Sequence, residues 1–186
     1  MIMRAEDKLQ EAKYFLDRLK EISRTISAES HWQEGRDVYA IESKFKHSFS
    51  ACVTALRSVF DVLLYDYAEK YKLIESRQDH MNRNEFSKKA KKCGSSESRK
   101  FINWYDEKFK ELEKIPLFFV RIATVHRGGS WMDTKIKDSY MITKEGIEIE
   151  KEIQIGAMPE TVAVSECEKI YLQMDKIVKE AREKFR

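Results

Sequence analysis

Hydrophobic residues in the first part of the chain recur with the spacing of an amphipathic helix. Between about Arg4 and Ser27 they stand three or four positions apart and so share one helical face: Leu9, Ala12, Leu16, Leu19, Ile22 and Ile26. The segment that follows, SAESHWQEGRD (27–37), is rich in small and polar residues, and Asp37 can cap a second helix. The pattern predicts one helix over about Arg4–Ser27 and then a connection.

A much longer helical pattern comes next. From about Val38 to Leu73 the chain has no Gly or Pro, and its apolar residues form a wide stripe: Phe45, Phe49, Cys52, Val53, Leu56, Val59, Phe60, Leu63, Leu64 and Tyr67. At 1.5 Å per residue this helix would be about 50 Å long. We expect it to be the central helix of a bundle, to contribute to a dimer interface, or to be broken near one end.

The third part of the pattern predicts shorter elements. Residues 74–82 (IESRQDHMN) are typical of a loop, and Ser95 or Ser96 is an expected N-cap for a helix over about Glu97–Lys114. Proline is tolerated in a first helical turn, so a short helix is predicted over about Pro116–His126, ended by GGS.

The hydrophobic period changes from 3.6 to two after residue 131. The segment KIKDSYMITKEGIEIEKEIQIG alternates apolar and polar residues around the turn residues 144–146, which predicts a β-hairpin over about 134–155. A final amphipathic helix is predicted near the C-terminus, with one apolar face: Val164, Cys167, Ile170, Tyr171, Met174, Ile177, Val178 and Ala181.

Composition agrees with a mostly α protein of one domain, 1–186. Charged residues make up 36% and the chain has only 6 Gly and 2 Pro. The formal charge of +3 permits an acidic partner without requiring one. Cys52, Cys93 and Cys167 show neither a disulfide framework nor a zinc-site spacing, and we expect reduced thiols.

We expect a cytoplasmic protein with no membrane span. The N-terminal sequence MIMRAEDKLQEAKYFL lacks the apolar core of a signal peptide. The best membrane candidate, VTALRSVFDVLLYDYA, is interrupted by Arg57, Asp61 and Asp66 well short of the roughly 20 apolar residues that a span needs. A buried helix is the better interpretation of that stretch.

One motif draws attention to possible chemistry. In PLFFVRIATVHRGG, Arg121 and His126 follow the most apolar run of the chain. The pattern Arg-x(4–6)-His is expected about 0.8 times by chance in a chain of this composition, and a second match, Arg24 to His31, exists without an apolar context. One interpretation is a capped helix end, with His126 and Arg127 against its carbonyl groups; the other is a phosphate-handling site.

The chemistry that such a pair suits is the cleavage of RNA without a metal. A guanidinium gives a bidentate contact to phosphate oxygens, and it can stabilise the charge that grows in the transition state. An imidazole that titrates near neutrality can take a proton from a 2′-OH or donate one to the leaving 5′-oxygen. Arg121 would then bind phosphate, and His126 would be the general acid or base.

The chain resembles the HEPN family in three pieces that occur in order. These are FKHSFSACVTALRSVFDVLL in the long helix, FINWYDEKF in the next predicted helix, and PLFFVRIATVHRGG, within about Val38–Gly129. HEPN domains are α-helical bundles that often act as metal-independent ribonucleases through an Arg-x(4–6)-His motif. The resemblance therefore implies a HEPN-like helical bundle, with a small β-hairpin before its C-terminal helix, and assigns the catalytic pair to Arg121 and His126.

The resemblance also implies partners. In such proteins the site usually forms across a homodimer, with one Arg and one His from each subunit. The family commonly has a polar residue directly after the Arg; this chain has Ile122, and Thr124 is the nearest polar side chain within the motif. Two alternatives stay open: a noncatalytic homodimeric interaction module, and the toxin of a toxin–antitoxin pair that a nucleotidyltransferase-like antitoxin would silence.

Two further groups are candidates for supporting roles. The segment Arg83–Lys100 has seven Lys/Arg and two Glu, so it carries +5, and a cluster of this kind either follows a phosphate backbone or is a solvated helix face: Lys88, Lys89, Lys91, Lys92, Arg99 and Lys100. Arg57 and Asp61, four apart amid apolar residues, predict a buried pair that anchors the bundle or orients the motif. No spacing indicates a metal or a cofactor.

Overall fold

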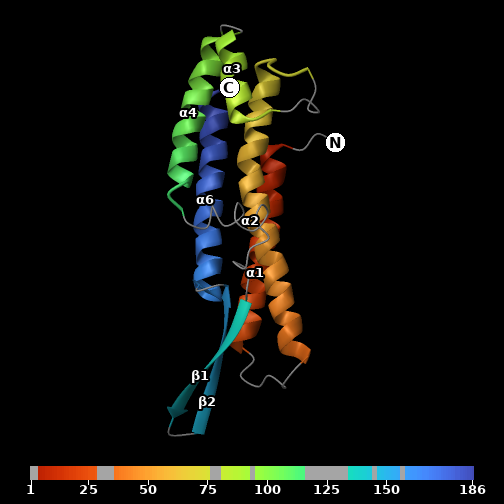
Figure 1. The fold of residues 1–186 in the computed structure, drawn as a ribbon, viewed down its shortest axis with the longest axis vertical. Coiled ribbons are helices and arrows are strands. Elements are labelled where there is room, and N and C mark those ends of the chain that lie inside the picture. Colours follow the sequence, from red (N-terminus) through yellow and green to blue (C-terminus); the bar gives the residue numbers. More distant parts are fainter. Residues whose placement is uncertain are drawn as a thin grey trace.

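The protein is mostly α-helical, as the hydrophobic pattern predicted. A computed structural model describes residues 4–28, 36–75, 81–92, 95–115, 134–143, 146–155 and 158–186. Within these ranges the helices are α1 (Ala5–Ala28), α2 (Arg36–Lys70), α3 (Arg83–Lys92), α4 (Ser96–Leu112) and α6 (Glu160–Lys184). They form an elongated bundle, with α3 and α4 at one end and the strands at the other (Figure 1).

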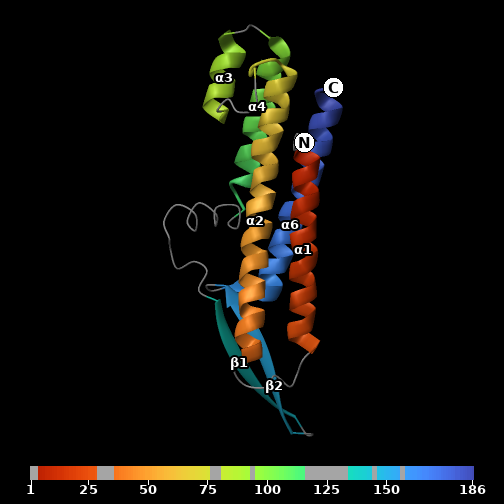
Figure 2. The same cartoon turned by 90° about the vertical axis from the view of Figure 1, so that its right-hand side faces the viewer.

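Helices α1, α2 and α6 run side by side along the length of the bundle (Figures 1 and 2). Buried residues of α1 are spaced alternately four and three apart: Ala5, Leu9, Ala12, Leu16 and Leu19. The buried face of α6 has a similar spacing, with Ala163, Cys167, Ile170, Met174, Ile177 and Ala181. This spacing keeps one seam of each helix against its neighbours, as in coiled-coil packing. The predicted first and last helices are thereby confirmed.

The central helix α2 confirms the predicted long helix and ends three residues before Leu73. Its 35 residues correspond to a length of about 50 Å. After Lys70 the backbone of Lys72 takes φ 54°, the left-handed conformation in which glycine is more common. Leu73 N–H then donates to Ala68 O (2.8 Å) and Lys72 N–H to Glu69 O (3.0 Å), which is the Schellman pattern of helix termination.

Helix α4 packs on the C-terminal half of α2 through aromatic rings. Tyr105 stacks on Phe60 with ring centroids 4.1 Å apart, and Phe101 stacks on Tyr67 at 4.2 Å. Ser95 is the N-cap of α4, since its Oγ accepts from the N–H of Ser98 at 3.2 Å. The helix predicted over Glu97–Lys114 is therefore confirmed, with ends shifted by one or two residues.

Helix α3 covers part of α4, and the hydrophobic pattern had left it unassigned. Phe86 and Ala90 are its buried residues, and the Phe86 ring lies 5.4 Å from that of Phe101. Asn82 caps its start, because the Asn82 side chain accepts from the N–H of Glu85 at 3.0 Å. Because only two of its ten residues are buried apolar ones, the hydrophobic periodicity of α3 is too weak to predict the helix.

The residues between 134 and 159 contain strands β1 (Thr134–Thr143), β2 (Gly146–Ile155) and β3 (Met158–Pro159). Strand β1 pairs antiparallel with β2, in a register that runs from Thr134 opposite Ile155 to Thr143 opposite Gly146. The short β3 pairs with the end of β2, giving the order β1-β2-β3.

One stretch of α2, Ser43–Lys70, is long and apolar enough to cross a membrane by length and composition alone, with a mean hydropathy of 1.3. Half of its most apolar 18-residue segment is buried inside the bundle. A core helix of a helical bundle has the same property, and the packing of α1, α4 and α6 around α2 accounts for the hydropathy of this stretch.

Candidate functional site

The principal sequence motif lies outside the described residues. Arg121, Thr124, His126 and Arg127 belong to this group, as does the helix predicted over Pro116–His126. The described chain ends before them at Ile115, whose N–H donates to Leu112 O at 3.0 Å and whose side chain packs against the core. The motif, which begins at Pro116, therefore starts four residues after the end of α4.

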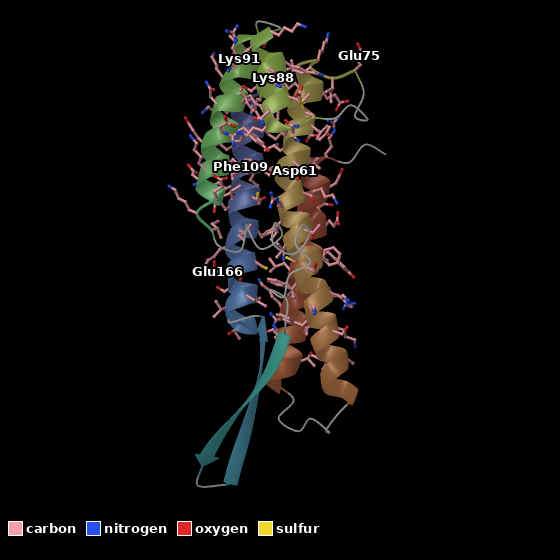
Figure 3. All side chains as sticks on the ribbon, in the orientation of Figure 1. Asp61, Glu75, Lys88, Lys91, Phe109 and Glu166 are labelled. Atoms are coloured by element: carbon pink, nitrogen blue, oxygen red, sulfur yellow. The ribbon has the colours of Figure 1, made fainter. Side chains whose placement is uncertain are left out.

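Arg57 and Asp61 are not buried as the sequence predicted. Asp61 is exposed and Arg57 only partly buried. The reason is their place on α2: Thr54, Ser58 and Tyr65 share a row with Asp61 and are also partly exposed, so this row lies at the edge of the apolar stripe. Figure 3 shows Asp61 on α2 at about the same height along the bundle as Phe109 on α4.

A small group of charges surrounds the buried Tyr105 where α2, α3 and α4 meet. Arg83 Nε lies 2.5 Å from Asp106 Oδ1, and the Arg83 guanidinium lies 5.6 Å from the centre of the Phe109 ring. Burial, assisted by the nearby carboxylates of Asp61 and Asp106, raises the pKa of Tyr105 well above its usual 10. The hydroxyl stays protonated at neutral pH and donates to Phe60 O at 3.3 Å, so it can anchor α4 but cannot act as a base.

Most cations of the predicted basic segment lie on the surface of α3 and α4. We call this set the basic end: Lys88, Lys91, Lys92, Arg99 and Lys100, all exposed. Lys88 pairs with Glu85 at 3.4 Å and Lys100 with Glu97 at 3.0 Å, both one helical turn away, while their side chains remain 76% and 68% exposed. Figure 3 shows Lys88 and Lys91 at the α3 end of the bundle, far from Glu166 on α6.

Lys89 differs from the other lysines of that segment. Its Nζ donates to Leu73 O at 3.0 Å, and its side chain is partly buried. This bond ties α3 to the chain that follows the end of α2. Lys89 is therefore a structural contact and not part of the exposed surface that the sequence predicted for it.

The structure also contains a charged group that no sequence motif indicated. We call it the interhelical charge cluster: Arg4, Glu6, Asp66 and Arg182. The Asp66 side chain is 1% exposed, and its Oδ2 accepts from Arg182 Nη2 at 2.6 Å and from the Ala5 N–H at 3.2 Å. Arg182 also binds both carboxylate oxygens of Glu6, at 2.6 and 2.9 Å, and Arg4 lies 3.5 Å from Asp66 Oδ1.

This cluster joins three helices and is fully compensated. The Asp66 carboxylate sits at the N-terminus of α1, where free N–H groups favour a negative charge, and the Arg182 guanidinium stacks 5.4 Å from the Tyr67 ring centre. A carboxylate held in this way anchors the fold and does not react. An aspartate within an apolar helical stripe is a sequence signal for a partner, but 116 residues separate it from Arg182.

Two cysteines lie in the core, where α1, α2 and α6 meet. Cys52 and Cys167 are free and fully buried, and Cys52 Sγ lies 3.9 Å from Ala12 O. A hydrogen bond with Cys52 and burial raise the pKa of Cys167 well above its usual 9. Cys167 is therefore a thiol at neutral pH, and both side chains pack as apolar core residues.

No group of three or more metal-binding side chains occurs among the described residues. Comparison of the chain with protein families, with curated proteins and with solved structures finds no match. The surface with the clearest chemical character in the described part is the basic end, and the pair with the clearest catalytic chemistry in the sequence is Arg121 with His126.

Proposed function

We propose that this chain is a HEPN-like, metal-independent endoribonuclease in which Arg121 binds the scissile phosphate and His126 is the general acid or base. The packing of α4 on α2 carries the proposal most directly. Two pieces of the family resemblance, FKHSFSACVTALRSVFDVLL and FINWYDEKF, lie on these helices and are joined by the Phe60–Tyr105 stack. The third piece follows α4 in the chain.

The side chains proposed to orient the motif lie where α4 packs against α2. Phe109, near the end of α4, lies 5.8 Å from Phe60, and Arg57 and Asp61 flank Phe60 on α2. Arg121 is the sixth residue after Ile115 in the sequence. In the proposal, Arg57 and Asp61 orient the motif from this edge of α2, and Thr124 and Arg127 complete its polar groups.

The proposed reaction needs no external reactant. His126 removes the 2′-OH proton, the 2′-oxygen attacks the adjacent phosphorus, and the 5′-oxygen leaves with a proton from the second imidazole of a homodimer. Arg121 stabilises the charge on the phosphate oxygens. The products are a 2′,3′-cyclic phosphate and a 5′-hydroxyl end.

The test is incubation of the purified protein with single-stranded RNA in EDTA. We expect cleavage by the wild type and a loss of about 10²–10⁴-fold in rate for His126→Ala. His47→Ala is the matched control, because His47 is exposed on α2 and away from the motif in sequence. An oligonucleotide of the same sequence with 2′-deoxy sugars at every position should resist cleavage, because it lacks the attacking 2′-OH. Analysis of the ends of the RNA products should find the 2′,3′-cyclic phosphate.

The outcomes separate the proposal from its alternatives. Absence of cleavage at high protein concentration, or equal cleavage by wild type and His126→Ala, would falsify the enzymatic role. A homodimer in light scattering without cleavage would favour an interaction module. Cleavage that a nucleotidyltransferase-like partner suppresses would favour the toxin of a toxin–antitoxin pair.

A further inference from the structure

Positive charge is concentrated at one end of the molecule. The whole chain carries +3, whereas Arg83–Lys100 alone carries +5, so the remainder of the chain carries −2. The segment forms α3 and the start of α4, which lie together at the end of the bundle opposite the strands (Figure 1). A field of this kind attracts a polyanion to that end of the molecule.

The exposed lysines of α3 share one outward face. Phe86 and Ala90 point into the core, and Lys88 lies on the opposite side with Lys91 and Lys92, which follow it by three and four positions. Like charges at this spacing repel each other and weaken an isolated helix. Lys91 and Lys92 also stand near the C-terminus of α3, where a cation is favourable, but Lys88, Arg99 and Lys100 lie outside that turn.

Hydrogen bonds fix the position of the helices that carry the basic end. Lys89 bonds to Leu73 O, Tyr65 Oη accepts from the Met81 N–H at 2.9 Å, and Ser95 caps α4. The carboxylates near the surface cations, Glu85 and Glu97, form only exposed pairs one turn away. Such pairs contribute little and are readily exchanged for phosphate.

We propose that the basic end is a docking surface for the phosphate backbone of single-stranded RNA. Phe101, Trp104 and Tyr105 of α4 are buried and Phe109, its fourth aromatic residue, is partly buried, so none of these four rings is exposed for a base to stack on. Contact is therefore with phosphates and not with base edges. Binding is insensitive to base sequence and strongly dependent on salt.

An anionic membrane fits this surface less well. Membrane-surface helices bury an apolar face between the headgroups. The exposed large hydrophobic side chains of the described residues are Tyr14, Val162 and Leu172, which lie on α1 and α6. The inference rests on the proposed function for its choice of RNA, while the docking itself requires no cleavage.

The test uses a fluorescent 20-nucleotide 2′-deoxyuridine oligomer, which lacks the 2′-OH, and a uridine RNA of the same length with the His126→Ala protein. Fluorescence anisotropy measures affinity between 50 and 300 mM salt. For the triple variant K91A/K92A/R99A we expect affinity to fall about tenfold or more, and the salt slope to fall by about two, since each phosphate contact contributes about 0.7 on a single strand.

A matched triple variant, K44A/K110A/K176A, removes the same charge from exposed positions elsewhere on α2, α4 and α6. It should retain the wild-type affinity and slope. Equal losses in the two triples, an unchanged slope in the first, or binding to phosphatidylserine vesicles in place of either oligomer would overturn the inference. Circular dichroism and urea unfolding verify that both triples fold.

Failure of docking and failure of the proposed reaction are distinguishable. If the triple variant of the basic end loses oligomer binding while the wild type cleaves no RNA, the docking surface is supported and the proposed reaction is rejected. If the wild type cleaves RNA and the K91A/K92A/R99A variant binds both oligomers as tightly as the wild type does, the proposed reaction is supported and the docking surface is rejected.

Discussion

The interhelical charge cluster and the basic end use the same kinds of side chain in opposite ways. In the cluster, Asp66 is 1% exposed and is bound by Arg182 and by a backbone N–H. At the basic end, Lys88 and Lys100 are about two-thirds or more exposed, and their acidic partners are on their own helices. The cluster connects α1, α2 and α6, whereas the pairs of the basic end connect nothing beyond one turn.

The difference teaches that burial and the origin of the partner decide what a charge does. A buried charge that loses its partner is left without solvent, and the cost reaches several kcal/mol. An exposed charge is already solvated, and its loss changes stability by a few tenths of a kcal/mol. Charge at the basic end is therefore available to a ligand, and charge in the cluster is committed to the fold.

The largest expected effect comes from breaking the cluster. Asp66→Ala removes a hydrogen-bonded partner of Arg182, whose side chain is 36% exposed and keeps its bonds to Glu6, and it leaves the Ala5 N–H without its acceptor, so we expect a loss of about 2–3 kcal/mol in the free energy of unfolding. Urea denaturation followed by circular dichroism measures it. Asp17→Ala is the matched control, because Asp17 is 54% exposed and pairs with Lys13 on α1 itself. It should cost about 0.5 kcal/mol or less.

Similar losses in these two aspartate variants would contradict the distinction between the two regions. A loss for Asp66→Ala that becomes smaller when Arg182 is replaced by Met in the same chain would support it. The second substitution removes the guanidinium that has lost its Asp66 partner and keeps most of the side-chain volume.

The helices were predictable where burial imposes a period. In α1, α2, α4 and α6 an apolar residue recurs every three or four positions, and these helices were expected within a few residues of their bounds. Helix α3 was not predicted, because Phe86 and Ala90 are its only buried residues. Asn82 followed by Glu85 resembles a capping sequence, a local signal that could have located its start.

The candidate surface was only partly predictable. The charge of Arg83–Lys100 is visible in the sequence, but nothing in the sequence separates Lys89, which bonds to Leu73 O, from Lys91, which is exposed. The pairing of Asp66 with Arg182 depends on how α6 returns beside α2, which no local pattern encodes. Asp61 was assigned to the interior because its neighbours are apolar, although its row lies at the edge of the apolar stripe of α2.

An intermediate effect on stability is expected from Lys89, the partly buried lysine of the basic segment. Lys89→Ala removes a charged hydrogen bond to Leu73 O in a partly buried site, and we expect a loss of about 1 kcal/mol or slightly more. Lys91→Ala, two residues away, should change stability by less than about 0.5 kcal/mol. Oligomer binding should change in the reverse order. A Lys91 variant as destabilised as the Lys89 variant would mean that the basic end belongs to the fold.

The smallest expected effect is the pH dependence of the Glu6 contact. Hydrogen bonding to Arg182 lowers the pKa of the Glu6 carboxyl below its ordinary value of 4.5, although partial burial opposes this. A lowered folded-state pKa means that the contribution is complete above about 4.5 and is lost as pH falls through the folded-state pKa. Glu6→Gln should therefore be less stable than the wild type at pH 7, and the difference should shrink towards pH 3. Urea unfolding at pH 7, 5, 4 and 3 measures this, with Glu21→Gln on the exposed face of α1 as the control. A wild-type advantage that is constant over this range would show that Arg182 holds Glu6 through packing alone.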